Sequence, residues 1–277
     1  MDDDVFRLRA AEGPDWVARV FPGRSREAVD GDAEVLRWLE LQDFPAERCA
    51  VPDPVSELAA SNGTASTAAA SSVLLTEYVD PVPRAQRRQT IKAAGGLFRL
   101  GAMLGDLHRL AGGPERPAGA WHRVADGLPA REIEAARRWA PALPWEQVHD
   151  GSGLPEAFTH PDFVLANVVA TPEPDMVIVD WTGAGCGPRA WSLAFLLWAE
   201  GLRDVRRARL VLAGYRTRVT LEPEEIQALP ALMGARPMVL DAWRVAHGHR
   251  AEADALAAAA ADRVHAQQIA DALRDLL

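Results

Sequence analysis

The feature that most constrains this chain is a change in the spacing of its apolar residues at about residue 80. Before that point, short runs such as residues 16–21 alternate between apolar and polar side chains, which is the pattern of strands. After Pro81 and Pro83, apolar residues recur at helical spacing. The chain therefore predicts an α+β fold, with a small sheet-rich part at residues 1–79 and a larger helical part at residues 80–277.

Individual elements follow from the same spacing. Runs at residues 5–9 and 16–21 flank a turn-forming segment and predict a hairpin. A helix is expected at 26–41, a loop of small residues at 56–72, and a strand at 72–79. In the second part we expect short strands at 168–170 and 176–179 and helices at 89–111, 130–140, 192–200, 204–219, 223–231 and 237–277.

Composition excludes several classes of protein. The net charge of −9 argues against nucleic acid as a partner, because phosphate binding needs a basic face. The acidic start is unlike a secretory signal, and no apolar run is long enough to span a membrane. Two cysteines are too few for a disulfide framework. We expect a cytoplasmic protein without a membrane or nucleic-acid partner, whose oligomeric state the sequence does not give.

The residues that suggest chemistry lie between His160 and Asp180. Asn167 follows Asp162 by five residues, and an apolar run then ends in Asp180. Phosphoryl transfer needs a carboxylate to accept the acceptor's proton, a second to hold Mg²⁺ and an amide oxygen as a further ligand. Asp162, Asp180 and Asn167 fit these roles in that order. The alternative is a loop followed by an ordinary hairpin, without chemistry.

This stretch resembles the signature of the aminoglycoside phosphotransferase and choline kinase-like families, which are relatives of protein kinases. Those families show His-Gly-Asp, an Asn five residues after the Asp, an Ile-Asp-Trp-Glu-like segment and then Gly-Pro or Gly-Asp. The matching residues here are His160-Pro161-Asp162, Asn167, Val179-Asp180-Trp181, Gly187-Pro188 and, upstream, Leu107-His108. The resemblance spans most of the chain, with its specific motifs between residues 107 and 200, and implies a bilobal, protein kinase-like fold.

The resemblance also implies roles for the motif residues. Asp162 would be the catalytic base, and His160 would brace the loop that carries it. Asn167 and Asp180 would bind Mg²⁺. The implied partners are ATP or GTP as phosphoryl donor and a small-molecule acceptor with a hydroxyl group, such as an aminoglycoside, an amino alcohol or a sugar.

Further residues are implied for the nucleotide and the acceptor. Arg19 stands where the family has its phosphate-binding lysine, and Glu34 stands at the helix position that would pair with it. Glu77 and Val79 belong to the hinge strand, whose backbone would contact the base. Acceptor contacts are expected from Trp181, Glu200 and Asp241.

Three departures separate this chain from the family pattern. Arg19 replaces lysine, and the planar guanidinium differs in geometry from an ammonium group. The run at residues 5–8 resembles the family's second strand, so we expect a truncated N-terminal lobe without a first strand and phosphate-covering turn. Ser192 stands where the family has an aspartate that buttresses the catalytic loop.

These departures leave two functions open. The leading one is a small-molecule kinase, favoured by Asp162, Asn167 and Asp180. The alternative is a catalytically silent, kinase-like binding or scaffold protein, favoured by Arg19 and the missing hairpin. A third class, an unrelated helical hydrolase, has no visible nucleophile motif. Mg²⁺-dependent nucleotide binding separates the first two.

Overall fold

The computed structural model describes residues 4–58, 71–115, 129–173 and 175–277. The chain forms two compact units. Unit 1 comprises residues 1–82 and 169–181, and unit 2 comprises residues 83–168 and 182–277. The first break lies close to the boundary expected at residues 79 and 80. The segment 169–181, which we expected within the second part, belongs to unit 1.

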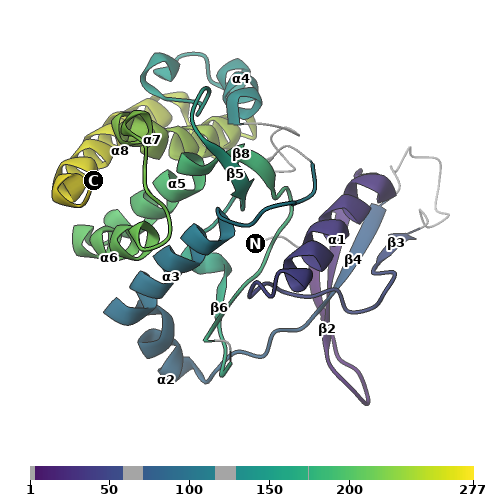
Figure 1. Cartoon of the computed structure of the whole chain (residues 1–277). Coiled ribbons are helices and arrows are strands. Elements are labelled where there is room, and N and C mark those ends of the chain that lie inside the picture. Colours follow the sequence, from purple (N-terminus) through teal and green to yellow (C-terminus); the bar gives the residue numbers. More distant parts are fainter. Residues whose placement is uncertain (1–3, 59–70, 116–128, 174) are drawn as a thin grey trace, which may run out of the picture. The chain divides into compact units, whose positions relative to one another are not determined.

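A four-stranded antiparallel sheet forms the centre of unit 1 (Figure 1). Its strands lie in the order β1-β2-β4-β3, with bounds Val5–Leu8, Trp16–Pro22, Ser71–Glu77 and Val55–Leu58 respectively. β1 and β2 form the expected hairpin, with Val5 opposite Arg19. The strand expected at 72–79 is β4, and it pairs with β2 over the full length of both. Most of the loop expected at 56–72 lies outside the described residues, but its described ends are strand instead: residues 56–58 belong to β3 and residues 71–72 to β4.

Helix α1 (Arg26–Leu41) packs against strands β3 and β4 through an apolar stripe. Ser25 begins the helix, because its hydroxyl accepts a hydrogen bond from the Ala28 N–H at 3.3 Å. Asp32 lies on the buried side of the helix, where Arg24 contacts its carboxylate at 2.7 Å. This ion pair compensates the charge of Asp32.

Strand pairing explains why the segment 169–181 belongs to unit 1. Strands β6 (Val168–Ala170) and β7 (Met176–Ile178) form a two-stranded sheet. β7 also pairs in parallel with the segment after α1: the Glu47 N–H donates to the Ile178 carbonyl at 3.0 Å, and the Ile178 N–H donates to the Pro45 carbonyl at 2.9 Å. These bonds join two segments that are distant in sequence, so apolar spacing alone did not predict them.

Unit 2 is mainly helical (Figure 1). Its α-helices are α2 (Arg84–Arg87), α3 (Ala94–Leu107), α4 (Pro129–Trp139), α5 (Arg189–Gly201), α6 (Val205–Arg216), α7 (Pro223–Ala246) and α8 (Glu252–Leu273). A π-helical turn at Arg88–Lys92 precedes α3. Strands β5 (Glu156–Thr159) and β8 (Gly185–Pro188) pair antiparallel. Within the described residues, no helix combines the length and apolar character needed to cross a membrane.

Helix α7 corrects one expectation from the sequence. We expected a break between residues 231 and 237, but α7 continues through Pro230 and Pro237. A proline inside a helix costs about 3 kcal/mol, so packing must offset it. α7 packs against α4, α5 and α8, and Pro237 is itself buried. The helix ends only at Ala246, and Gly248 then adopts a φ of +68°.

Helices α3 and α6 approach each other unusually closely at two glycines. A Cβ added to Gly101 would lie 1.9 Å from the Val211 carbonyl oxygen, and one added to Gly214 would lie 1.9 Å from that of Phe98. Real Cβ atoms do not approach backbone oxygens so closely. The absence of a side chain at both positions therefore sets the spacing of these two helices.

His108 makes the stability of unit 2 depend on pH. It follows α3, is buried, and bonds through Nδ1 to the Tyr215 hydroxyl at 2.9 Å. Burial, with a smaller contribution from the charge of Arg189, lowers the pKa of His108 from 6.5 to about 3. Between these two values the unfolded chain binds the extra proton, so the free energy of unfolding decreases as pH falls, by at most about 1.4 kcal/mol per pH unit.

We expect His108→Gln to remove this contribution. Urea unfolding at several pH values between about 4 and 7.5 would measure it, because the model-peptide pKa of histidine lies inside that range. The difference in unfolding free energy between the variant and the wild type should shift in favour of the variant as pH falls. A difference that is constant with pH would contradict the assignment.

Candidate functional site

The predicted catalytic residues of unit 2 lie on the loop after β5. The Asp162 side chain is 40% exposed, and its backbone N–H donates to Nδ1 of the buried His160 at 3.0 Å. A ring nitrogen that accepts a hydrogen bond carries no proton, so the neutral His160 ring has its proton on Nε2. His160 therefore holds the backbone of the loop, while the side chain of Asp162 remains accessible.

Ser192 ties the same loop to helix α5. Its buried hydroxyl donates to the His160 carbonyl at 3.0 Å. The sequence departs from the family pattern at this position, and the structure shows what the serine does there. A neutral hydroxyl connects α5 to the loop backbone without introducing a buried charge.

A hydrogen bond to the backbone of Asp162 orients the side chain of Asn167. It ends a 3₁₀ turn, Leu165–Asn167, and its side-chain Nδ2 donates to the Asp162 carbonyl at 2.9 Å. A carbonyl can only accept a hydrogen bond, so the amide nitrogen faces it and Oδ1 points away from it. An oxygen held in this way is a ligand of the type that Mg²⁺ prefers.

Arg236 is a neighbour of Asp162 that the sequence did not predict. It lies on α7, its side chain is 2% exposed, and its Nη2 contacts Asp162 Oδ1 at 3.2 Å. The guanidinium also lies over the ring of Phe195, 5.6 Å from the centroid. Since 74 residues separate Arg236 from Asp162, no short motif joins them. The arginine supplies a buried positive charge beside the carboxylate.

In unit 1, Asp180 belongs to a cluster of four residues that we call the Glu47 cluster: Arg19, Glu47, Thr76 and Asp180. Glu47 Oε2 accepts from Arg19 Nη1 at 2.8 Å and from the Thr76 hydroxyl at 3.0 Å. Glu47 Oε1 accepts from the Asp180 backbone N–H at 2.6 Å. Asp180 itself has a φ of +69°, which is in the left-handed region. The cluster joins β2, β4, the segment after α1 and the end of β7.

The expected pairing of Arg19 with Glu34 is wrong. Glu34 lies on the exposed side of α1, whereas Arg19 bonds to Glu47. The reason is geometric: the buried side of α1 carries Asp32, which pairs with Arg24, and the segment after α1 places Glu47 beside β2. Glu47 lies outside every motif recognised in the sequence, so the sequence did not identify it as a partner of Arg19.

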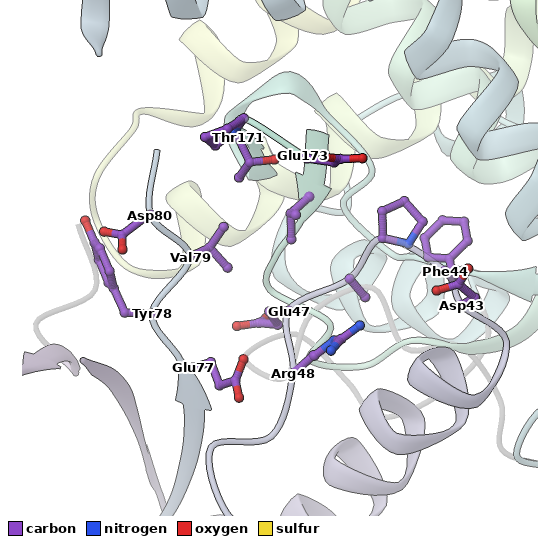
Figure 2. Close-up of a pocket in the computed structure, with 14 residues that line it drawn as sticks. Asp43, Phe44, Glu47, Arg48, Glu77, Tyr78, Val79, Asp80, Thr171 and Glu173 are labelled. Atoms are coloured by element: carbon purple, nitrogen blue, oxygen red, sulfur yellow. The ribbon is translucent and has the colours of Figure 1, made fainter. Parts of the chain in front are cut away.

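Unit 1 also contains a cavity of about 630 Å³ (Figure 2). Figure 2 shows the expected hinge residues Glu77 and Val79 on the chain that leaves β4, with Glu47 on the opposite side. The apolar lining of the cavity includes Val177. The charged residues that line the cavity are Asp43, Glu47, Arg48, Glu77, Asp80 and Glu173. The volume suits a small ligand, and five carboxylates with one arginine give the lining a negative charge.

The residues expected to contact the acceptor are buried in the structure. Glu200 on α5 is 1% exposed and bonds to Arg207 on α6. Asp241 on α7 is 3% exposed and contacts Arg244 and Arg250. Both carboxylates are buried and engaged in ion pairs with arginines, and their contact with an acceptor stays a prediction.

Trp181, the third residue expected near the acceptor, packs inside unit 1. Its side chain is buried, its Nε1 donates to the Ile178 carbonyl at 3.0 Å, and its ring meets Phe44 edge to face at 5.7 Å. These contacts make Trp181 part of the core of unit 1.

Asp162 and Asn167 belong to unit 2, whereas Asp180 and the cavity belong to unit 1. Within the described residues, no group of three or more His, Cys, Asp or Glu side chains forms a metal site.

The chain resembles several solved kinases, each at low identity. An aminoglycoside phosphotransferase from Alicyclobacillus acidocaldarius is 15% identical with a TM-score of 0.63, covering 100% of this chain and 91% of that one. Choline kinase LicA from Streptococcus pneumoniae is 15% identical with a TM-score of 0.60, covering 95% and 90%. An amicoumacin kinase in complex with AMP-PNP and Ca²⁺ is 15% identical with a TM-score of 0.62, covering 98% and 89%.

These likenesses confirm the α+β, protein kinase-like fold. No curated protein matches the chain in sequence. The pattern of the phosphotransferase enzyme family (APH), however, matches residues 1–229 of the 277. With more than half of its length matched, the chain belongs to the phosphotransferase enzyme family.

Proposed function

We propose that this protein transfers the γ-phosphoryl group of ATP or GTP to a hydroxyl group of a small molecule. The observation that carries the proposal is the loop of unit 2, where His160 and Asn167 hold the backbone on both sides of an accessible Asp162 carboxylate. A carboxylate held in this way can orient an acceptor hydroxyl and accept its proton as the phosphoryl group transfers.

The donor nucleotide is proposed to bind through its base at the cavity of unit 1. Val79, Val177 and Phe44 provide apolar surface for a purine ring, next to the hinge residue Glu77. Carboxylates in the lining repel phosphate groups, so the triphosphate would lie outside the cavity. A structural relative is bound to AMP-PNP, which supports a nucleoside triphosphate as donor.

Mg²⁺ is the proposed cofactor, and the donor set fits it. Asn167 offers an amide oxygen and Asp180 a carboxylate, and both are hard oxygen ligands. When bound, Mg²⁺ neutralises charge on the phosphates. The residues of this chain then have separate tasks: Asp162 accepts the proton, His160 and Ser192 hold the loop, and Arg236 provides a fixed positive charge beside Asp162.

The acceptor is proposed to be an aminoglycoside, an amino alcohol or a sugar-like molecule. Support comes from the relatives, which include an aminoglycoside phosphotransferase and a choline kinase. The net charge of −9 is compatible with a cationic acceptor. We also propose a cytoplasmic location, supported by the free thiols of Cys49 and Cys186.

One observation favours the alternative, a silent binding protein. Arg19, which stands at the position of the phosphate-binding lysine, is only 12% exposed and is neutralised by Glu47. A guanidinium committed to a buried carboxylate has less charge to offer to phosphate. The accessible Asp162 carboxylate and the oriented Asn167 amide favour the kinase.

Thermal unfolding in the presence of nucleotide tests the proposal. We expect ATP or GTP with Mg²⁺ to raise Tm, because a ligand at about 100 times its Kd stabilises the folded state by about 2.7 kcal/mol. The Mg²⁺-dependent part of the shift should disappear in Asp180→Ala. An unchanged Tm with both nucleotides, with and without Mg²⁺, would contradict the kinase and support the silent binding protein.

A further inference from the structure

Glu47 accepts hydrogen bonds from three different elements of unit 1. Its side chain is 2% exposed, and its partners are Arg19 on β2, Thr76 on β4 and the backbone N–H of Asp180. A buried carboxylate is costly unless donors of this kind surround it. Its own backbone N–H is bonded to Ile178 in β7. Glu47 is therefore fixed relative to the end of β7 and to Asp180, the residue that is expected to bind Mg²⁺.

The backbone of Asp180 depends on this contact. Its φ of +69° lies in a region that residues other than glycine seldom adopt. The N–H of the strained residue meets the Glu47 carboxylate at 2.6 Å, and a charged acceptor makes a stronger hydrogen bond than a neutral one. Glu47 thereby compensates the strain and sets the direction in which the chain leaves β7.

The charges around Arg19 give Glu47 a second role. Burial alone would lower the pKa of Arg19, but the charges of Glu47 and Asp180 outweigh it and leave the pKa raised. The charges of both carboxylates act on Arg19, and its hydrogen bond, at 2.8 Å, goes to Glu47. The third acidic neighbour, Asp32, is paired with Arg24. Without the charge of Glu47, Arg19 would compete with any cation for Asp180.

We propose that Glu47 is a positioning residue that keeps Asp180 available to a divalent cation, by orienting its backbone and by neutralising Arg19. The proposal rests on the proposed function, because it takes Asp180 as a ligand of the Mg²⁺ that accompanies the nucleotide. It distinguishes two effects on binding: loss of the Glu47 charge weakens the contribution of Mg²⁺, whereas binding of the nucleotide without metal is unchanged or stronger, because the released Arg19 charge can attract phosphate.

Calorimetry with AMP-PNP provides a readout that does not depend on turnover. The quantity measured is the ratio of the Kd without Mg²⁺ to the Kd with Mg²⁺. Glu47→Gln keeps an oxygen for the Asp180 N–H but removes the charge, and we expect the ratio to fall by about tenfold or more. The double variant Arg19→Gln/Glu47→Gln removes both charges and should recover the wild-type ratio. Glu57→Gln, an exposed site on β3, is the matched control.

A ratio in Glu47→Gln equal to that of the Glu57→Gln control overturns the proposal, and so does a double variant that is no better than the single one. If Glu47→Gln does not fold, Arg19→Gln replaces it in the comparison. Its ratio must exceed that of the double variant, since Glu47 then adds an uncompensated negative charge; equal ratios overturn the proposal. Wild-type protein without any Mg²⁺-dependent binding would contradict the proposed function itself.

Discussion

Asp162→Asn should lower kcat by about 10²- to 10⁴-fold, the usual contribution of a general base. The amide cannot accept the acceptor's proton, but its oxygen can still accept the hydrogen bond from Arg236. The fold and the Kd for Mg²⁺–nucleotide should stay close to those of the wild type. Steady-state kinetics with an acceptor found by screening aminoglycosides and amino alcohols, together with thermal unfolding, would measure both.

The choice of asparagine follows from Arg236. Asp162→Ala leaves a guanidinium that is 2% exposed without its carboxylate, and breaking a buried pair in this way costs up to about 3–5 kcal/mol. The half-exposed Asp162 places this variant at the low end of that range. Alanine therefore mixes loss of stability with loss of catalysis. Turnover retained in Asp162→Asn would rule out Asp162 as the base.

Gly101→Ala and Gly214→Ala should each destabilise unit 2 by about 3 kcal/mol, the upper part of the usual range for overpacking. A Cβ at either position meets a backbone oxygen at 1.9 Å, and a backbone oxygen cannot rotate away as a side chain can. Helices α3 and α6 must separate, and their apolar contacts are lost. Tm should fall by several degrees, roughly 2–4 °C per kcal/mol for a domain of this size.

Gly234→Ala is the matched control for this pair. Gly234 also lies inside a helix, α7, but its added Cβ would meet nothing within 4 Å. Since alanine is the better helix former by about 1 kcal/mol, Tm should stay the same or rise slightly. The double variant Gly101→Ala/Gly214→Ala should cost less than the sum of the single ones, because the first separation makes room for the second Cβ. Equal Tm values for all three single variants would contradict the close approach.

What the sequence could predict depended on the distance between the partners along the chain. The hairpin of β1 and β2 and the strand β4 follow from local spacing and turn residues. His160, Asp162 and Asn167 stand within eight residues of one another, so their mutual hydrogen bonds form wherever the motif folds as a loop. For these three residues, the sequence motif and the hydrogen-bonded loop therefore cover the same stretch of chain.

The partners that sequence reasoning missed are far apart in the chain. Glu47 and Asp180 are 133 residues apart, and Arg236 and Asp162 are 74 apart. Their side chains meet only because strands pair or helices pack, and residue type alone does not reveal such a meeting. Residue type alone also does not separate an accessible acidic residue from one that, like Glu200 and Asp241, is the buried partner of an arginine.

The left-handed backbone at Asp180 sets stability against the proposed binding of Mg²⁺ at a single position. Glycine adopts a φ of +69° without steric cost, whereas an ordinary L-residue loses roughly 1–2 kcal/mol there. A search for heat-resistant variants would therefore accept glycine at residue 180 and discard the carboxylate with it. Thermostability is therefore a misleading guide at a proposed Mg²⁺ ligand, and libraries aimed at a more robust protein should leave residue 180 unchanged.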